Sequence, residues 1–404
     1  MDAAPAWFRA ALLPLAGIAA VLAAPAQDPE DCPWCGNDPR RLAALGSVSH
    51  GPIAVGFEGS SKDIRSFFEP DPWTFLETAH VRWASSLGPQ RLSARDRKRL
   101  EPVFEEIAAA LPDFPRPGRI QRLDPWERLH LHAWRLERFY ERFQRILGVT
   151  DADFPATRAA GGPYMGNGPY LGEAEKFEFL LFRRRSDYQA YTERFLGVRV
   201  TDSLRWHHRD PHKLVGVLVC EDSDLRDDRW LYPHLVHNMS HMMLAAYKHF
   251  SYDPPVWLDE GLAHAMEREA DPESWTREGE EGTYRERGRS QDWSKTVPAL
   301  VRRGRAPSFT TLLNRHTIGE LRDEEHATCW SLVRFLLEEH PEGFARFLGG
   351  VKGQLDERGY PSGHDLLGLQ RRLLREIWGW TPQDLEEAWK TWVLEGGHAQ
   401  PSGS

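Results

Sequence analysis

Two histidines in the sequence HNMSH, His237 and His241, have the spacing of a metal-binding pair on a helix. Four residues turn an α-helix by about 400°, so both imidazoles leave the same face. Such a pair can supply two neighbouring ligands of a tetrahedral zinc site. The spacing alone is weak evidence, because a chain of 404 residues with 17 histidines contains on the order of one such pair by chance.

The sequence after this pair strengthens the case for a metal site. Eighteen residues separate His241 from Glu260, which lies in WLDEGLA. A glutamate that opens a second helix at this distance can return to the first helix and complete a site of two histidines and one carboxylate. The alternative interpretation of WLDEGLAHAME is an ordinary capped amphipathic helix.

Taken together, HxxxH, eighteen residues and WLxEGLA resemble the gluzincin metallopeptidases, in particular secreted peptidase-like domains whose second zinc helix begins W-L-x-E-G-x-A. The resemblance covers residues from about 177 to 393 and includes the late helix HATCWSLVRFLLEEHPEGFARFL. It implies that His237, His241 and Glu260 bind Zn²⁺. It also implies that a strand over 214–220 is the sheet edge along which a substrate backbone is aligned.

Asn238 departs from the family pattern, H-E-x-x-H, in which the glutamate is the general base. A carboxamide is not basic, and losing a general base typically costs about a hundred- to ten-thousand-fold in rate. A further expectation from the resemblance is that His326 lies near an oxyanion-stabilising tyrosine of the family and could donate a hydrogen bond there.

No other residue is a convincing replacement for the base. Asp259 is adjacent to Glu260 but points about 100° away from it on a helix. Glu267 and Glu269 are expected to orient a ligand histidine or to face solvent. His234 is expected to be a core or surface histidine.

This resemblance and its departure at Asn238 imply a gluzincin-like zinc-binding protein that hydrolyses peptides poorly or not at all and binds peptide or protein segments. Two alternatives remain open: an active zinc metallopeptidase with a relocated base, and a metal-free interaction domain. From the sequence, an Asn238→Glu substitution is expected to restore measurable cleavage.

The elements that must position the site predict an α+β, mostly helical fold. A helical region over 61–150 precedes a Gly/Pro-rich linker over 151–172 and a gluzincin-like domain over 173–395. Strands are expected over 177–182 and 214–220, with a short helix between them and a loop containing His207, His208 and His212. One long helix should begin after Asp124 and end at Gly148. His130 and His132 in this helix are two residues apart, so they cannot share a metal on one face.

The amino-terminal end has the features of a secretory signal. Residues 1–26 contain Arg9, an apolar run and a small-residue cleavage site after Ala26, which predicts a secreted or periplasmic protein that does not span the membrane. A membrane anchor is the less favoured alternative, because the run is short for a span and contains Pro14. The net charge of −9 and the lack of a basic-aromatic array argue against nucleic-acid binding. Residues 396–404 are expected to be a disordered tail.

The four cysteines lie in two different contexts. Cys32 and Cys35 fall in the segment 27–60, and they are expected to form a local disulfide or to bind a metal with partners that the sequence does not identify. A redox role is disfavoured, because the following residues GNDPRR do not provide the helix of a thioredoxin-like unit. Cys220 and Cys329 are expected to be buried thiols, or a pair.

Overall fold

The computed structural model describes residues 32–36, 38–57, 59–115, 120–154, 163–208, 212–279, 283–287 and 292–397. The predicted signal peptide and residues 398–404 of the predicted tail lie outside the described residues. No helix among the described residues is long and apolar enough to cross a membrane.

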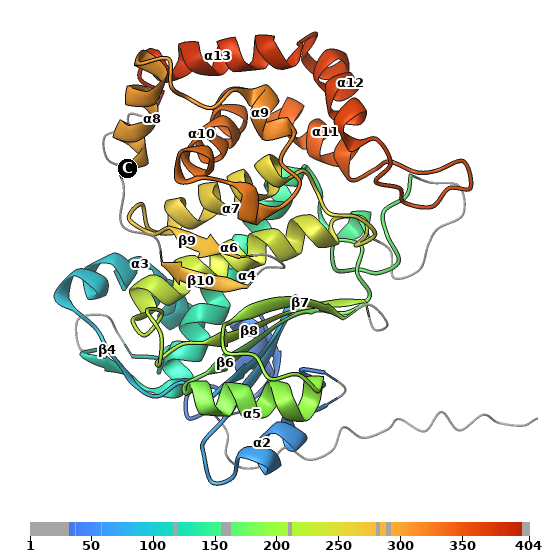
Figure 1. The fold of residues 1–404 in the computed structure, drawn as a ribbon. Helices are drawn as coiled ribbons and strands as arrows, with labels where there is room; N and C mark the ends of the chain where they lie inside the picture. The colour runs from blue at the N-terminus through green and yellow to red at the C-terminus, as the bar shows by residue number, and fades with distance from the viewer. Residues whose placement is uncertain are drawn as a thin grey trace, which may run out of the picture.

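A mixed six-stranded sheet forms the centre of the molecule (Figure 1). Its spatial order is β1 (Ser47–Ser49), β2 (Thr74–Thr78), β3 (Val81–Ser85), β6 (Phe177–Phe182), β8 (Lys213–Val219) and β7 (Leu204–His208). Strands β3, β6 and β8 are parallel, and the other pairs are antiparallel. Every residue of β6 and β8 is buried, as expected for strands that are covered on both faces.

Helices cover the two faces of this sheet. Helices α2 (Ser61–Phe68) and α5 (Arg185–Leu196) lie on one face, and α4 (Pro125–Leu147) and α6 (Asp228–Ala246) lie on the other (Figure 1). Helix α4 has the predicted capping box between Asp124 and Glu127, and it ends at Gly148 in the left-handed conformation with φ of 68°. The predicted helix boundaries are therefore confirmed by the cap geometry.

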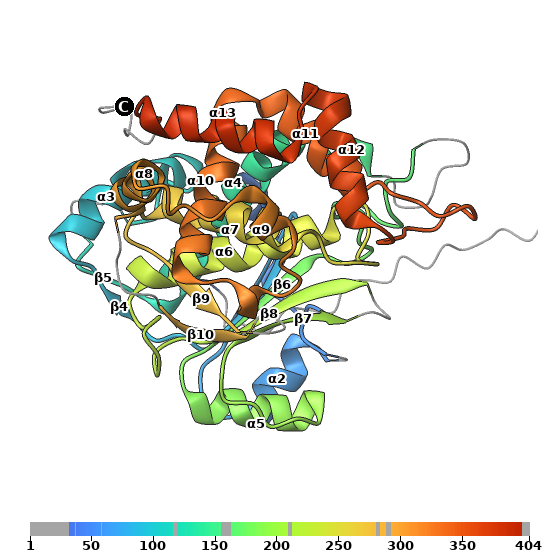
Figure 2. The same ribbon diagram turned by 45° about the horizontal axis from the view of Figure 1, so that its top comes forward.

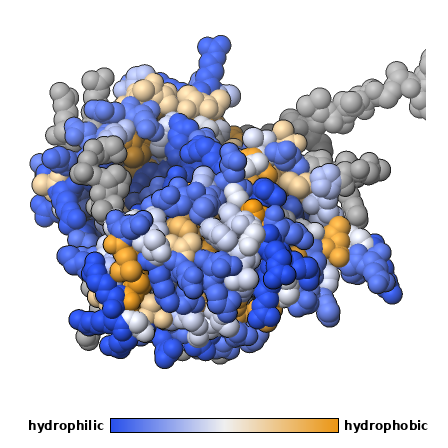
Figure 3. All heavy atoms as spheres, turned by 90° about the horizontal axis from the view of Figure 1, so that it is seen from above, coloured by the Kyte–Doolittle hydropathy of each residue, from blue (hydrophilic) through white to orange (hydrophobic). Residues whose placement is uncertain are grey.

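The carboxy-terminal half is built of helices that stack on α6. Helix α7 (Val256–Ala270) lies between α6 and α10 (Asp323–Glu339) (Figures 1 and 2). The outer helices are α8 (Trp293–Arg302), α9 (Phe309–Leu313), α11 (Pro341–Val351), α12 (Leu366–Trp378) and α13 (Pro382–Leu394). The face on which α12 and α13 lie is mostly hydrophilic, with small separate apolar patches (Figure 3).

Two separate two-stranded sheets and further helical elements complete the described part of the fold. The pairs are β4 (Gln90–Arg91) with β5 (Arg122–Leu123), and β9 (Thr276–Glu278) with β10 (Tyr284–Arg287). The remaining helices are α1 (Pro39–Ala44), α3 (Ala94–Ala110) and the 3₁₀ turns Asp151–Asp153 and Ile318–Glu320. The fold is α+β and mostly helical, as the sequence predicts.

The sheet extends further than the sequence predicts. The region 61–150 is mainly helical, but it also contributes β2 and β3, and β3 pairs with β6. The linker predicted over 151–172 therefore does not divide the sheet. Ala79 and His80 join β2 to β3 without the glycine or asparagine that marks a two-residue hairpin, so the turn gave no sequence signal.

The prediction of a loop before β8 is wrong for His207 and His208, because both lie at the end of β7. His212 lies in the turn between β7 and β8, as expected, with a left-handed φ of 52°. Strand β7 pairs along the outer side of β8. The predicted role of β8 as the sheet edge is therefore wrong, and β7 is the edge strand.

Candidate metal centre

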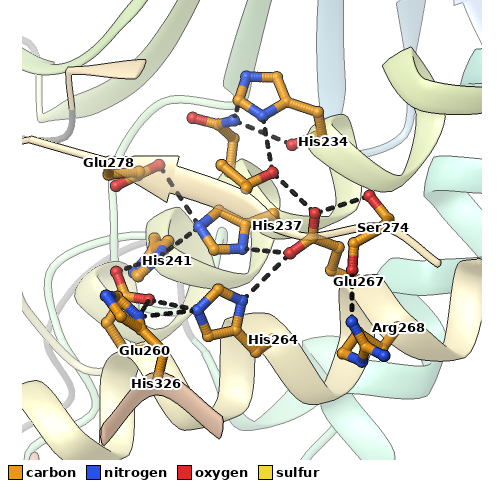
Figure 4. A network of polar contacts seen from close by, with 12 residues as sticks. His234, His237, His241, Glu260, His264, Glu267, Arg268, Ser274, Glu278 and His326 are labelled. Atoms are coloured by element: carbon orange, nitrogen blue, oxygen red, sulfur yellow. Dashed lines mark hydrogen bonds and ion pairs between the residues drawn. The ribbon is translucent and has the colours of Figure 1, made fainter. Parts of the chain in front are cut away.

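Four buried side chains from three elements converge beside the sheet. Helix α6 provides His237 and His241, α7 provides Glu260, and β9 provides Glu278 (Figure 4). One ligand atom of each lies within 4.8 Å of the others. The structure thus brings the three predicted ligands together and adds a fourth candidate, Glu278, that sequence reasoning missed.

The spacing of these atoms fits a tetrahedral metal ion. The two Nε2 atoms of His237 and His241 are 3.2 Å apart. Glu260 Oε1 is 3.8 Å from His241 Nε2, and Glu278 Oε1 is 3.5 Å from His237 Nε2. Ligands at about 2.0–2.2 Å from a zinc ion in tetrahedral geometry lie about 3.3–3.6 Å from one another. The three distances are close to this spacing, and all four ligand atoms lie within 4.8 Å of one another, so the cluster could hold a metal ion.

Close packing of α7 against α10 sets the position of Glu260. A Cβ atom added at Gly261 would lie 2.6 Å from the carbonyl oxygen of Cys329 and 2.6 Å from Val333 Cγ2. Any larger residue would push the two helices apart. Gly261 of WLDEGLA is thus explained by the close packing of two helices beside the candidate metal ligands, and not by a left-handed backbone conformation.

Carboxylates face the second nitrogen of both histidines. Glu267 Oε2 lies 3.1 Å from His237 Nδ1, and Asp259 Oδ2 lies 2.8 Å from His241 Nδ1. A carboxylate in this position places the proton on Nδ1 and leaves Nε2 free to bind a metal. Glu267 thus has the orienting position that the sequence suggested for it, whereas Glu269 is exposed and pairs with Arg142.

The Glu260 carboxylate divides its two oxygens between the cluster and two further histidines. Oε2 lies 2.9 Å from His264 Nε2 and 3.4 Å from His326 Nδ1. Oε1 faces the cluster, and both oxygens are buried and have no partner in hydrogen-bond geometry among the described residues. A buried oxygen in this condition needs an explanation, and a bound cation supplies one. His264 was missed, although its position four residues after Glu260 was a usable signal.

His326 lies beside the Glu260 carboxylate and approaches the same oxygen as His264. Its Nδ1 is also 3.1 Å from His264 Nε2, and the ring is buried. His326 therefore helps to hold Glu260 in place. Its predicted role as an oxyanion donor stays a prediction.

Asn238 directs its amide group toward His234 and Arg205, and not toward the four candidate metal ligands. Its Nδ2 donates to the carbonyl oxygen of His234 at 2.9 Å and lies 3.0 Å from His234 Nε2. Its Oδ1 accepts a hydrogen bond from Arg205 Nη1 at 3.3 Å. Burial and the nearby His237 lower the pKa of His234 to about 4, so this ring is neutral and accepts at Nε2.

Arg205 also pairs with Glu278, the residue that completes the cluster. Its Nη1 donates to Glu278 Oε1, and both side chains are largely buried. Burial alone would raise the pKa of Glu278, but Arg205 and the nearby histidines outweigh it and hold the pKa well below its usual range. An ionised carboxylate of this kind is a good metal ligand and a poor general base.

The same carboxylates favour a positive charge at the cluster. Burial opposes protonation of His237, but Glu267 and Glu278 outweigh burial and raise its pKa to about 10. In the absence of a metal, a proton satisfies this demand. A divalent cation would displace that proton, since metal ligands must be deprotonated.

No protein-family model and no curated protein matches this chain. The chemistry of the cluster therefore has to be argued from its own geometry.

Proposed function

We propose that the protein is a gluzincin-like zinc-binding protein that does not hydrolyse peptides and that binds peptide or protein segments. The position of Glu278 is the observation that carries the non-catalytic part of this proposal. Catalytic zinc sites have three protein ligands and keep a fourth position for water, whereas structural sites have four protein ligands. As a fourth ligand, Glu278 would take the position that a catalytic site leaves to water.

The donor set supports zinc as the metal. Two imidazoles and two carboxylates at tetrahedral spacing suit a borderline ion such as zinc, whereas calcium and magnesium prefer six or more oxygen ligands. The His237, His241, Glu260 and Glu278 side chains would hold it, with Glu267 and Asp259 orienting the two rings. A bound zinc would tie α6, α7 and β9 together.

Among the described residues, no carboxylate stands at the position of the general base beside this cluster. Asn238 stands at the position of the general base and is bonded to His234 and Arg205. Glu278 is a carboxylate near the metal position, which would favour an active peptidase with a relocated base. Its pairing with Arg205 argues against that role, because it makes the carboxylate less basic.

The edge strand β7 supports the binding part of the proposal. The β9–β10 hairpin covers its first residues: Tyr284 N donates to the carbonyl oxygen of Ser203, and Leu204 bridges to Thr283. Among the described residues, no further strand pairs with the rest of this edge. A cavity of about 280 Å³ adjoins the end of β7 and is lined in part by His207 and Phe250. An extended segment could add to this edge by backbone hydrogen bonds.

The metal part is tested by zinc analysis of the purified protein and two histidine variants. His241→Ala should lower the zinc content by one per chain. His212→Ala is the matched control, because His208 and His212 have the same spacing in sequence but lie on β7 and in the following turn. Equal zinc content in both variants would favour the metal-free interaction domain.

The catalytic and binding parts need two further measurements. The zinc-loaded protein should leave a peptide library uncleaved, and chelator-sensitive cleavage would overturn the non-catalytic proposal. A peptide that binds should slow amide hydrogen exchange in residues 205–208 of β7. Binding that leaves these amides unprotected would contradict the strand-addition proposal.

A further inference from the structure

We propose that Cys32, Cys35, His50 and His130 form a second, structural zinc site that fastens the amino-terminal segment to α4. This site shares no residue with the central cluster. Its ligands come from the turn before α1, from the residue after β1, and from the first half of α4. The sequence indicated a metal site as one alternative for the two cysteines, and the structure supplies the partners.

The ligand atoms converge with the spacing of a tetrahedral site. Cys32 Sγ is 3.1 Å from His130 Nε2, and Cys35 Sγ is 3.1 Å from His50 Nε2 and 3.8 Å from His130 Nε2. All four ligand atoms lie within 4.8 Å of one another. With Zn–S near 2.3 Å and Zn–N near 2.0–2.1 Å, sulfur and nitrogen ligands should be about 3.6 Å apart. Two cysteines and two histidines are a recurrent ligand set of structural zinc sites.

The backbone around the cysteines turns both thiols to one side. The carbonyl oxygen of Cys32 accepts a hydrogen bond from Gly36 N, and that of Cys35 accepts one from Asp38 N, each at 2.9 Å. Gly36 has a φ of 54°, a left-handed conformation that glycine adopts without steric cost. The C-x-x-C spacing and the following glycine are thus accounted for by a tight turn around one point.

The two other readings of the cysteine pair fit the structure less well. No disulfide joins any of the four cysteines, all of which are described. A redox pair needs an accessible thiol, whereas Cys32 and Cys35 are both 0% exposed. A metal site is the alternative that fits both the converging ligand atoms and the burial of the two thiols.

The surroundings give the site a structural purpose. The cysteines belong to a small core that is separate from the main one and includes Leu100, Phe104 and Phe114. Trp126 packs against His50 with ring centroids 4.9 Å apart. A bound metal would stabilise such a small core, because the free energy of metal binding contributes directly to the free energy of folding. Helix α4 links this small core to the main core.

Cobalt substitution of the wild-type protein tests the proposal without any variant. The central cluster contains only nitrogen and oxygen ligands, and among the candidate metal groups of the described residues the cysteine site alone contains thiols, so a thiolate-to-cobalt charge-transfer band reports on that site. We expect the band in the cobalt-loaded protein. A cobalt-loaded protein without the band, or a Cys32–Cys35 disulfide found in the native protein by mass spectrometry, would overturn the proposal.

Variants then assign the ligands. Cys32→Ser should lose one zinc per chain and the cobalt band, whereas the matched control Cys220→Ser, also at a buried cysteine, should keep both. His130→Cys should retain the zinc, because it preserves four ligands. Zinc content and a cobalt band that are unchanged in Cys32→Ser would overturn the assignment. His241→Ala should keep the band, which separates failure of this site from failure of the central one.

Discussion

Replacing Glu267 by glutamine is expected to weaken zinc binding at the central cluster about 10- to 100-fold. Glu267 receives hydrogen bonds at Oε1 from Ser274 at 2.8 Å and Thr276 at 2.7 Å, while Oε2 faces the Nδ1 atoms of His237 and His264. Glutamine keeps the shape of the side chain, but its NH₂ group is itself a donor. It would face either the two hydroxyl donors or the two imidazole rings, and would lose the hydrogen bonds on that side. Loss of a partner that orients a ligand histidine typically weakens metal binding by this factor, or about 1.4–2.7 kcal/mol.

Chelator competition with a zinc-binding dye measures this change. Glu269→Gln is the matched control, because it is the same substitution two residues further along α7 at an exposed position. It should leave zinc affinity within about twofold of wild type. Unchanged affinity in Glu267→Gln, or an equal loss in both variants, would refute the proposed orientation of His237.

Three further predictions follow from the contacts around the cluster. Asn238→Glu alone should not restore peptide cleavage, since Arg205 would pair with the new carboxylate and Glu278 would still take the fourth ligand position. Adding Glu278→Gln to this variant should raise chelator-sensitive cleavage on the order of a hundredfold. Cleavage by Asn238→Glu alone would contradict this prediction. The pKa of His237 is raised to about 10, so the proton on this ring stabilises the fold fully below about pH 6.5, and this stabilisation is lost toward pH 10. Zinc displaces that proton, and its affinity should therefore rise about tenfold per pH unit from pH 7 to about pH 9. A zinc affinity that does not change with pH would contradict the raised pKa as the cause. Asp228→Asn should destabilise the protein by about 3–5 kcal/mol in urea unfolding, with or without chelator, because the buried Arg128 guanidinium keeps only the more distant Glu221 as a carboxylate partner. A loss below about 1 kcal/mol would show that Glu221 compensates for Asp228.

The prediction for Asn238→Glu differs from the expectation based on the sequence. From HNMSH alone, the asparagine is the single obstacle to hydrolysis, so a glutamate at position 238 should repair the site. The structure adds two obstacles from elsewhere in the chain, Arg205 on β7 and Glu278 on β9. Both residues lie on strands outside the HNMSH helix, and only the folded chain brings their side chains to the site. A local sequence pattern does not reveal such contacts.

Local patterns were sufficient where a single element carries the information. The long helix α4, the buried strands β6 and β8, and the two ligand histidines on α6 could all be predicted from spacing and capping residues. The approach of Glu260 to these histidines could be predicted because the intervening chain is short and Glu260 opens a helix.

Contacts between distant segments could not be predicted in the same way. The His130 ring meets Cys32 across 98 residues of sequence, so the pair C-x-x-C could not be matched to its partners. The edge strand β7 was assigned to a loop, because LRWHH lacks the continuous apolar pattern of the buried strands. One side of β7 faces the hairpin and solvent, and polar residues are tolerated there.

Anomalous diffraction at the zinc absorption edge, from crystals grown with zinc, tests the central claim most directly. We predict one anomalous peak about 2.0–2.2 Å from the Nε2 atoms of His237 and His241 and from one oxygen each of Glu260 and Glu278. A zinc-loaded crystal with no peak among these four side chains would contradict the account.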